Sequence, residues 1–285
     1  MKTDEKRLFA LESMGFKEDP FKITTDPRFL YIGPQHQEIM RRIRTVVENY
    51  RGLAVVEGDY GTGKTTLLKR VDSLYRNDYP DDAYVIYTDS SHYSSEYSAL
   101  MDICNIIGLD KKRGITAQYR ELQSFITEQS KAGKTIILFM DDAQKMDVSV
   151  LNLIHELYNF EWNQKSVQTI LFGQPEISNI FARKPEVRSR VFSWFQLNPL
   201  TMSETYELVH FRCKVAGRDA QFIKENNFIK VFEATRGVPR YTVSLCAHII
   251  DLIMETGNIG LSTVDETVID QAIVRFQAGE NRGKE

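Results

Sequence analysis

The sequence has few cysteines, no long hydrophobic run and no apolar signal core near its start. Cys104, Cys213 and Cys246 are far apart, which fits neither a disulfide framework nor a metal-binding spacing. The longest apolar runs, such as Thr135–Met140, are far too short to span a bilayer, and the opening Met1–Arg7 is charged. We therefore expect a cytoplasmic protein without membrane contact, whose cysteines pack in apolar cores.

The sequence also lacks an excess of charge of one sign. Lys and Arg number 36 against 39 Asp and Glu, giving a net charge of −3. This balance excludes a uniformly basic nucleic-acid coat, although a local basic groove stays possible. There is no internal repeat or low-complexity tract, and 285 residues can form one large or two modest domains.

A phosphate-binding loop is the most informative pattern present. Gly58–Thr65 reads GDYGTGKT and matches G-x-x-x-x-G-K-[ST], between a buried strand and a helix. Glycines let the backbone N–H groups surround a phosphate, and the helix N-terminus adds its positive end. Lys64 would reach the β- and γ-phosphates, and the Thr65 hydroxyl would bind Mg²⁺. A glycine-rich turn is the alternative. The residues expected to contact the nucleoside triphosphate are Gly58, Asp59, Tyr60, Gly61, Thr62, Gly63, Lys64, Thr65 and Thr66.

Strands and helices alternate through the first two thirds of the chain, which predicts an α/β fold with a parallel sheet covered on both faces. The expected strands are Leu53–Glu57, Tyr84–Thr88, Thr135–Met140, Thr169–Phe172 and Trp194–Leu197. The expected helices are Leu8–Met14, His36–Tyr50, Thr65–Arg76, Tyr97–Ile107, Thr116–Lys131, Ser149–Phe160 and Glu176–Phe181.

After Pro199 the pattern becomes helical only. Capping boxes at Thr201–Glu204 and Thr263–Glu266 predict two helix starts. Helices are expected from 201 to about 215 and over 228–235, 241–256 and 264–276. We predict an N-terminal segment (1–34) that contributes to the nucleotide site, an α/β core (35–199), a small helical lid (200–278) and a polar tail (279–285).

Two adjacent acids end an apolar strand. A strand that delivers a carboxylate beside a phosphate loop is how such ATPases hold Mg²⁺ through water, which makes Asp141 the metal-side candidate. Asp142 would then orient and activate the attacking water as general base. The alternative is a turn with two solvated acids.

Further polar residues follow the next strands. Gln174 either senses the γ-phosphate or caps the following helix. Any one of Arg183, Arg188 and Arg190 could reach across a subunit interface as an arginine finger, although surface arginines are usually just solvated. Arg240 opens a helix of the lid and could contact the γ-phosphate of its own subunit.

Taken together, these residues resemble AAA+ ATPases of the ExeA/TnsC kind over about residues 8 to 276. The resemblance implies the AAA+ P-loop fold with a five-stranded parallel sheet, an ATP site between adjacent subunits and Arg240 as sensor 2. It also implies that Tyr31, Ile32 and Gly33 lie by the adenine. The matching motifs are Asp19-Pro20-Phe21, Asp26-Pro27-Arg28-Phe29-Leu30-Tyr31, His36, the phosphate loop, Asp141-Asp142-Ala143-Gln144, Gly173-Gln174-Pro175-Glu176 and Gly237-Val238-Pro239-Arg240.

One position departs from the family pattern. The second acid is usually Glu, whereas this chain has Asp142. The shorter side chain lies farther from the water, so we expect slow or partner-dependent hydrolysis, which suits a timing switch better than a motor.

The resemblance leaves two branches open. ExeA-like secretion ATPases carry a membrane span and a cell-wall-binding domain, neither of which we find here. TnsC-like regulators of DNA transposition assemble on duplex DNA when ATP-bound and connect target-selector proteins to a transposase. We expect this second function, with a homo-oligomeric ring or helical filament of about six or seven subunits per turn. The alternatives are a secretion or membrane-complex ATPase and a nucleotide-gated scaffold with little hydrolysis.

A short basic loop is the candidate DNA contact. Lys111, Lys112 and Arg113 lie between the second strand and the acid-bearing strand and could line a ring, or could simply be solvated. We expect a solvated face on the early helix, formed by Arg41, Arg42 and Arg44. Because no helix carries a base-reading set, we expect DNA binding without sequence preference.

Overall fold

The computed structural model describes residues 2–22, 24, 26–256 and 263–282, and the chain forms two compact units. Residues 34–198 form one unit, which we call the sheet unit. Residues 1–33 and 199–285 form the other, the helical unit. The N-terminal segment thus belongs to the same unit as the C-terminal helices.

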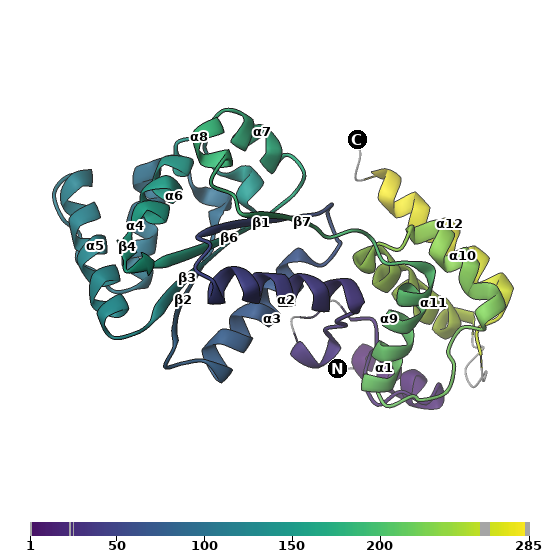
Figure 1. The fold of residues 1–285 in the computed structure, drawn as a ribbon. Coiled ribbons are helices and arrows are strands. Elements are labelled where there is room, and N and C mark those ends of the chain that lie inside the picture. The colour runs from purple at the N-terminus through teal and green to yellow at the C-terminus, as the bar shows by residue number, and fades with distance from the viewer. Residues whose placement is uncertain (1, 23, 25, 257–262, 283–285) are drawn as a thin grey trace. The chain divides into compact units, whose positions relative to one another are not determined.

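The sheet unit contains a five-stranded parallel sheet, which confirms the predicted fold class (Figure 1). The strands are rich in branched apolar residues, and the three central ones are almost entirely buried, as expected for a parallel sheet covered on both faces. In spatial order they are β2 (Ala83–Asp89), β3 (Thr135–Asp141), β6 (Val167–Gly173), β1 (Leu53–Glu57) and β7 (Ser193–Gln196).

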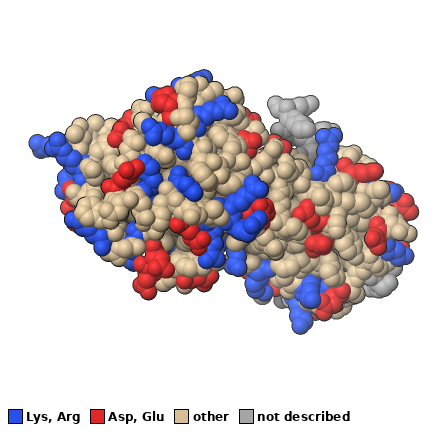
Figure 2. Space-filling model, viewed as in Figure 1, with Lys and Arg blue, Asp and Glu red and all other residues tan. Residues whose placement is uncertain are grey.

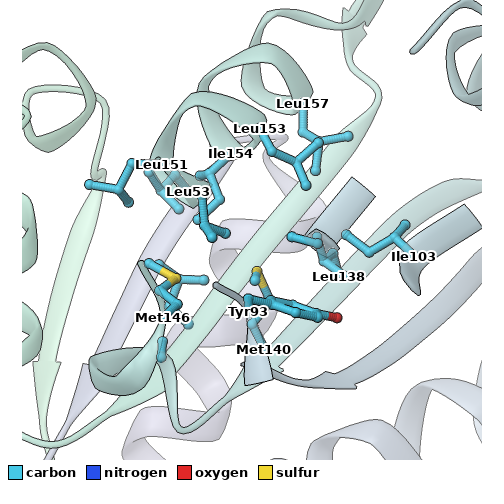
Figure 3. Packing of buried hydrophobic residues seen from close by; sticks show 14 of the residues in the cluster. Leu53, Tyr93, Ile103, Leu138, Met140, Met146, Leu151, Leu153, Ile154 and Leu157 are labelled. Atoms are coloured by element: carbon cyan, nitrogen blue, oxygen red, sulfur yellow. The ribbon is translucent and has the colours of Figure 1, made fainter. Parts of the chain in front are cut away.

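Successive strand residues point to opposite faces, so each face has its own apolar core. On one side of the sheet, the apolar side chains of α2 (Pro34–Glu48) and α3 (Lys64–Asp78) form a core together with strand residues such as Val56. Val55 belongs to the other core, which contains side chains of three long helices and of two short ones, α7 (Ile177–Ala182) and α8 (Pro185–Arg188). Figure 3 shows this second core, where strand side chains meet those of α6. The three long helices are α4 (Glu96–Ile106), α5 (Ile115–Lys131) and α6 (Val150–Asn159).

Several short elements complete the sheet unit. The β4–β5 hairpin and α8 were not predicted, because two-residue strands and a one-turn helix leave no periodicity to detect. The hairpin turns at Asn163, whose φ of 64° is in the left-handed region that Asn tolerates. The short elements are η2 (Ser90–His92), η3 (Ala143–Lys145), β4 (Glu161–Trp162), β5 (Gln164–Lys165), α7 (Ile177–Ala182) and α8 (Pro185–Arg188).

The helical unit packs its helices around one apolar core. Cys213 and Cys246 are buried in this core, and Cys104 is buried in the sheet unit, which confirms the expected role of the cysteines. No helix in the described part of the chain is long and apolar enough to cross a membrane. The helices are α1 (Lys2–Ser13), η1 (Pro27–Phe29), α9 (Met202–Val215), α10 (Glu225–Thr235), α11 (Pro239–Thr256) and α12 (Glu266–Arg282).

A buried arginine fixes the N-terminal segment to α9. Arg212 is 7% exposed, and its guanidinium donates hydrogen bonds to the carbonyl oxygens of Pro20 (2.7 Å), Lys22 (2.8 Å) and Phe29 (3.3 Å). The same guanidinium lies over the Phe29 ring, 5.0 Å from its centroid. Burying a guanidinium is costly unless it is hydrogen-bonded, and these carbonyls satisfy it.

One of the two predicted capping boxes is present. Thr201 and Glu204 exchange capping bonds at the start of α9, as predicted. The box at Thr263 was wrong, since α12 begins only at Glu266. Val264 instead donates its N–H to the Phe222 carbonyl oxygen (3.0 Å), which keeps its backbone extended. The helix then continues to Arg282, through the start of the expected polar tail, and residues 283–285 lie outside the described residues.

Candidate nucleotide-binding and hydrolysis site

The phosphate loop joins β1 to α3 at the carboxyl edge of the sheet. Gly61 (φ 81°) and Gly63 (φ 102°) occupy the left-handed region, where a side chain would be strained, and Gly63 is the N-cap of α3. Gly58 is needed for another reason, because a Cβ there would lie 2.5 Å from the Leu197 carbonyl oxygen. The predicted strand–loop–helix context is therefore present.

Lys64 is the first residue of α3 and is only 8% exposed. Its ammonium group donates hydrogen bonds to the carbonyl oxygens of Gly58 (2.7 Å) and Asp59 (2.9 Å), so the cation lies across the loop. Burial lowers the pKa of Lys64, and the nearby carboxylates, of which Asp141 has the largest effect, oppose that shift. The site thus holds a partly desolvated cation where an anion would bind.

Thr65 and Asp141 come together beside that cation. The Thr65 hydroxyl donates a 2.7 Å hydrogen bond to Asp141 Oδ2. Asp141 is 6% exposed, and burial raises its pKa. Ser90 Oγ donates to the Asp141 carbonyl oxygen (2.6 Å), which fixes the end of β3. A hydroxyl and a carboxylate are hard oxygen ligands, so the pair fits the expected Mg²⁺.

Asp142 follows directly and has a left-handed backbone, with φ of 52°. Its N–H donates to Asp141 Oδ1 (3.0 Å), while its own carboxylate accepts bonds from Lys145 Nζ (2.6 Å) and Gln144 Nε2 (3.2 Å). Burial raises the pKa of Asp142, but the bonds from Lys145 and Gln144 outweigh it and hold the pKa below the ordinary value. Asp142 therefore stays ionised, as a general base must.

Gln174 lies at the end of β6, between the loop and the acids. Its N–H donates to Gln144 Oε1 (2.9 Å), and its carbonyl oxygen accepts the N–H of Ile177 (2.9 Å). The adjacent Gly173 carbonyl oxygen accepts the N–H of Gly58 (3.1 Å). The end of β6 is therefore hydrogen-bonded to the phosphate loop on one side and to the acid-bearing turn on the other.

The other predicted loop residues differ in their exposure. Thr62 is fully buried, with its hydroxyl donating to the Asp59 carbonyl oxygen (2.8 Å). Tyr60 is 55% exposed, and Thr66 is half-buried in the first turn of α3. His36 from α2 lies beside the loop, because a Cβ on Gly63 would be 3.5 Å from His36 Nε2.

The remaining candidates are exposed residues of the sheet unit or belong to the helical unit. Arg183, Arg188 and Arg190 are all exposed, and Arg190 lies over the Tyr158 ring, 5.2 Å from its centroid. Tyr31, Ile32 and Arg240 belong to the helical unit, and their contact with nucleotide stays a prediction. Within that unit Tyr31 donates a 2.7 Å hydrogen bond to Glu207.

The candidate DNA loop joins α4 to α5. Lys111 and Arg113 are exposed, whereas Lys112 forms a 3.4 Å ion pair with Glu121. The Lys112 N–H also donates to Gln118 Oε1 (2.8 Å), which fixes the loop backbone. In Figure 2, basic and acidic side chains are interspersed over the visible face, in keeping with the near-neutral composition.

Sequence reasoning missed three neighbours of the acids. Asp89 ends β2 and pairs in register with Asp141, and an acid directly after an apolar strand is the same signal that identified Asp141. Lys145 lies three residues after Asp142, a spacing that brings charges together on one turn of helix. Ser90 gave no signal, because its contact with Asp141 depends on strand pairing.

This sheet order, phosphate loop and acid-bearing strand define an AAA+ P-loop fold. Residues 47–181 match the protein-family model described as AAA domain. The chain is 27% identical over 238 residues to general secretion pathway protein A of Aeromonas hydrophila. That match covers 81% of this chain and 42% of the relative, so the chain spans less than half the relative's length.

Solved structures show the same fold. The ORC2 protein of Aeropyrum pernix, in complexes with ADPNP and ADP, superposes with a TM-score of 0.67 at 16% identity, covering 92% of this chain and 72% of that one. Cdc6p of Pyrobaculum aerophilum gives 0.66 at 15% identity, with 86% and 67% covered. The RuvB Holliday junction branch migration motor of Thermotoga maritima gives 0.58 at 14%, with 86% and 72% covered.

Proposed function

We propose that the chain is a slow Mg²⁺-dependent ATPase used as a switch. The observation that carries this proposal is the contact between Thr65 and Asp141 beside the buried Lys64. Lys64 would hold the β- and γ-phosphates, and Thr65 and Asp141 would hold Mg²⁺, which neutralises charge on the phosphates. Asp142 would accept the proton of the attacking water.

The surroundings of Asp142 support slow turnover. Asp is one methylene shorter than Glu, so its carboxylate stays nearer its own backbone. Both of its oxygens are already hydrogen-bonded, one of them to the cation of Lys145. A water must compete with these donors for the carboxylate, which lowers the effectiveness of the base.

The finer proposal is a regulator of DNA transposition. In it, ATP drives homo-oligomerisation into a ring or filament on duplex DNA, and the assembly connects a target-selector protein to a transposase. The motif set described above is common to both branches of the family, and what supports this function is that the exposed cations of Lys111 and Arg113 are available for phosphate contacts. The structural likenesses concern the fold and leave this choice open.

A second candidate is a secretion or membrane-complex ATPase. The sequence similarity to general secretion pathway protein A over 81% of the chain favours it. The lack of a membrane span in this sequence does not argue against it, because the match leaves more than half of that relative outside the comparison. A nucleotide-gated scaffold with little hydrolysis is the third arrangement that the same site allows.

DNA binding with and without a non-hydrolysable ATP analogue separates these functions. The transposition regulator requires binding that depends on nucleotide, ignores sequence and weakens steeply with salt. Electron microscopy of the same mixture should show rings or filaments on the duplex. ATP hydrolysis without DNA binding would favour the secretion ATPase, and nucleotide-dependent partner binding with negligible hydrolysis would favour the scaffold.

The basic loop has a matched control. Replacing Lys111, Lys112 and Arg113 by Ala should weaken DNA binding and flatten its salt dependence while leaving nucleotide affinity unchanged. Replacing Arg41, Arg42 and Arg44 by Ala removes the same charge from ion-paired positions on α2 and should have a smaller effect. An equal effect of the two triple variants would assign no special role to the loop.

A further inference from the structure

The side chain of Gln144 connects the two polar segments of the site. Its Oε1 accepts the N–H of Gln174 at 2.9 Å, and its Nε2 donates to Asp142 Oδ1 at 3.2 Å. Both ends of one amide group are thereby used. One end holds the backbone after β6, and the other holds the carboxylate of the candidate base.

The approach of Gln144 to β6 depends on a glycine. A Cβ on Gly173 would lie 3.2 Å from Gln144 Oε1 and 3.3 Å from its backbone nitrogen, which is closer than side chains usually pack. The Gly173 carbonyl oxygen in turn accepts the N–H of Gly58. The Gly173 carbonyl group and the Gln174 N–H belong to the same peptide unit. That peptide unit and the hydrogen bonds on its two sides therefore form a continuous link from the phosphate loop through Gln144 to Asp142.

The local turn does not require this side chain. In η3 the backbone closes by itself, with Lys145 N–H donating to the Asp142 carbonyl oxygen (2.9 Å). The other partner of the Asp142 carboxylate, Lys145, is half exposed, and exposed ion pairs hold geometry weakly. The half-buried Gln144 is therefore the contact that can fix the orientation of Asp142.

We propose that Gln144 is a positioning residue, which fixes the position of the Asp142 carboxylate relative to the backbone of Gln174. A shift of the Gln174 segment then moves Asp142 with it, so that the two sides of the site act as one. The effect on turnover rests on the proposed hydrolysis, whereas the mechanical coupling of the two segments does not.

Gln144→Glu is the sharpest test. It keeps the side-chain length and an acceptor for the Gln174 N–H, but it replaces the donor to Asp142 by a second carboxylate. We expect kcat to fall about tenfold to hundredfold, with KM and nucleotide affinity within about twofold of the parent, because only orientation is lost. Gln123→Glu, on an exposed position of α5, makes the same charge change away from the site and should hydrolyse normally.

A thermal-stability cycle tests the contact without activity. In the double variant Gln144→Glu with Asp142→Asn, the new amide can donate to the new carboxylate, so the hydrogen bond forms in reverse. The loss of Tm in Gln144→Glu should then be recovered in the double variant. Normal hydrolysis by Gln144→Glu, or additive Tm changes, would overturn the proposal. If the parent protein hydrolyses no ATP, the proposed function fails and the Tm cycle alone decides the coupling.

Discussion

Thr65 donates its hydroxyl hydrogen to Asp141 across 2.7 Å, which joins the first turn of α3 to the end of β3. The two residues are 76 positions apart, so the fold is what creates this pair of oxygen ligands.

Thr65→Val removes the hydroxyl and leaves the buried Asp141 without that donor. We expect this variant to bind ATP more weakly than the parent does in Mg²⁺, because one of the two groups proposed to hold the metal is gone. Its affinity should then be about the same in Mg²⁺ as in EDTA. Stability should fall by about 1–3 kcal/mol, the usual cost of an unsatisfied buried acceptor. Thr45→Val, on an exposed turn of α2, is the control. Retained Mg²⁺ dependence in the Thr65 variant would exclude a metal role for its hydroxyl.

Lys64→Ala should abolish ATP binding and nucleotide-driven assembly, because the phosphates lose their cation. We expect affinity to fall by about a hundredfold or more, measured by titration with a fluorescent nucleotide. Lys69→Ala, exposed on the same helix, should bind as the parent does. An unchanged affinity in the Lys64 variant would contradict the assignment of the phosphate loop.

Asp142→Asn should keep ATP binding and assembly but reduce hydrolysis by about 10²- to 10⁴-fold, since an amide cannot accept the proton of the water. Asp141→Asn should instead weaken Mg²⁺-dependent binding. Phosphate release and nucleotide affinity, measured on both variants, separate the two roles. If Asp142→Asn hydrolyses ATP at the parental rate, the base is another residue.

An arginine finger acts on the neighbouring subunit, so its loss should lower hydrolysis without lowering ATP affinity. We expect this of Arg188→Ala or Arg190→Ala. Arg190→Ala should also cost about 0.5–1 kcal/mol of stability through its contact with Tyr158. Mixing the affected variant with Asp142→Asn should restore activity at about a quarter of the interfaces, where a good base meets a good arginine. No rescue for either would point to Arg183.

Gly237→Ala should destabilise the helical unit. Gly237 has φ of 71°, and a Cβ there would lie 2.0 Å from the Leu200 carbonyl oxygen. We expect a loss on the order of 1–3 kcal/mol, seen as a lower Tm. Gly279→Ala is the control, because α12 offers open space at that position and Ala favours a helix. Similar Tm values for the two variants would show that the segment before α11 adapts.

The sequence predicted those parts of the site that are local. The phosphate loop needs glycines in order along the chain, and Asp141 follows an apolar strand, so both leave a pattern in a single segment. The parallel sheet was accessible for the same reason, because long buried strands alternate with amphipathic helices, whereas the order of the strands left no local pattern.

The parts of the site that the sequence did not predict depend on contacts between segments far apart in the chain. The Ser90 contact with Asp141 and the Gln144 contact with Gln174 exist only because β2, β3 and β6 are neighbours in the sheet. The capping box at Thr263 failed similarly, since a backbone pairing with Phe222 overrode the local preference. Propensity is a weak guide wherever tertiary hydrogen bonds compete.

The attachment of residues 1–33 to the C-terminal helices has a consequence for synthesis. The sheet unit can fold as soon as residue 198 has left the ribosome, because all of its strands are then available. The first 33 residues cannot, since Phe16, Phe21 and Phe29 share one apolar core with residues from Val209 onward. During translation these aromatic residues stay uncovered while more than half the protein is produced. Exposed apolar side chains make a partly synthesised chain prone to aggregation, so these three aromatic residues carry that risk until α9 to α12 have been synthesised.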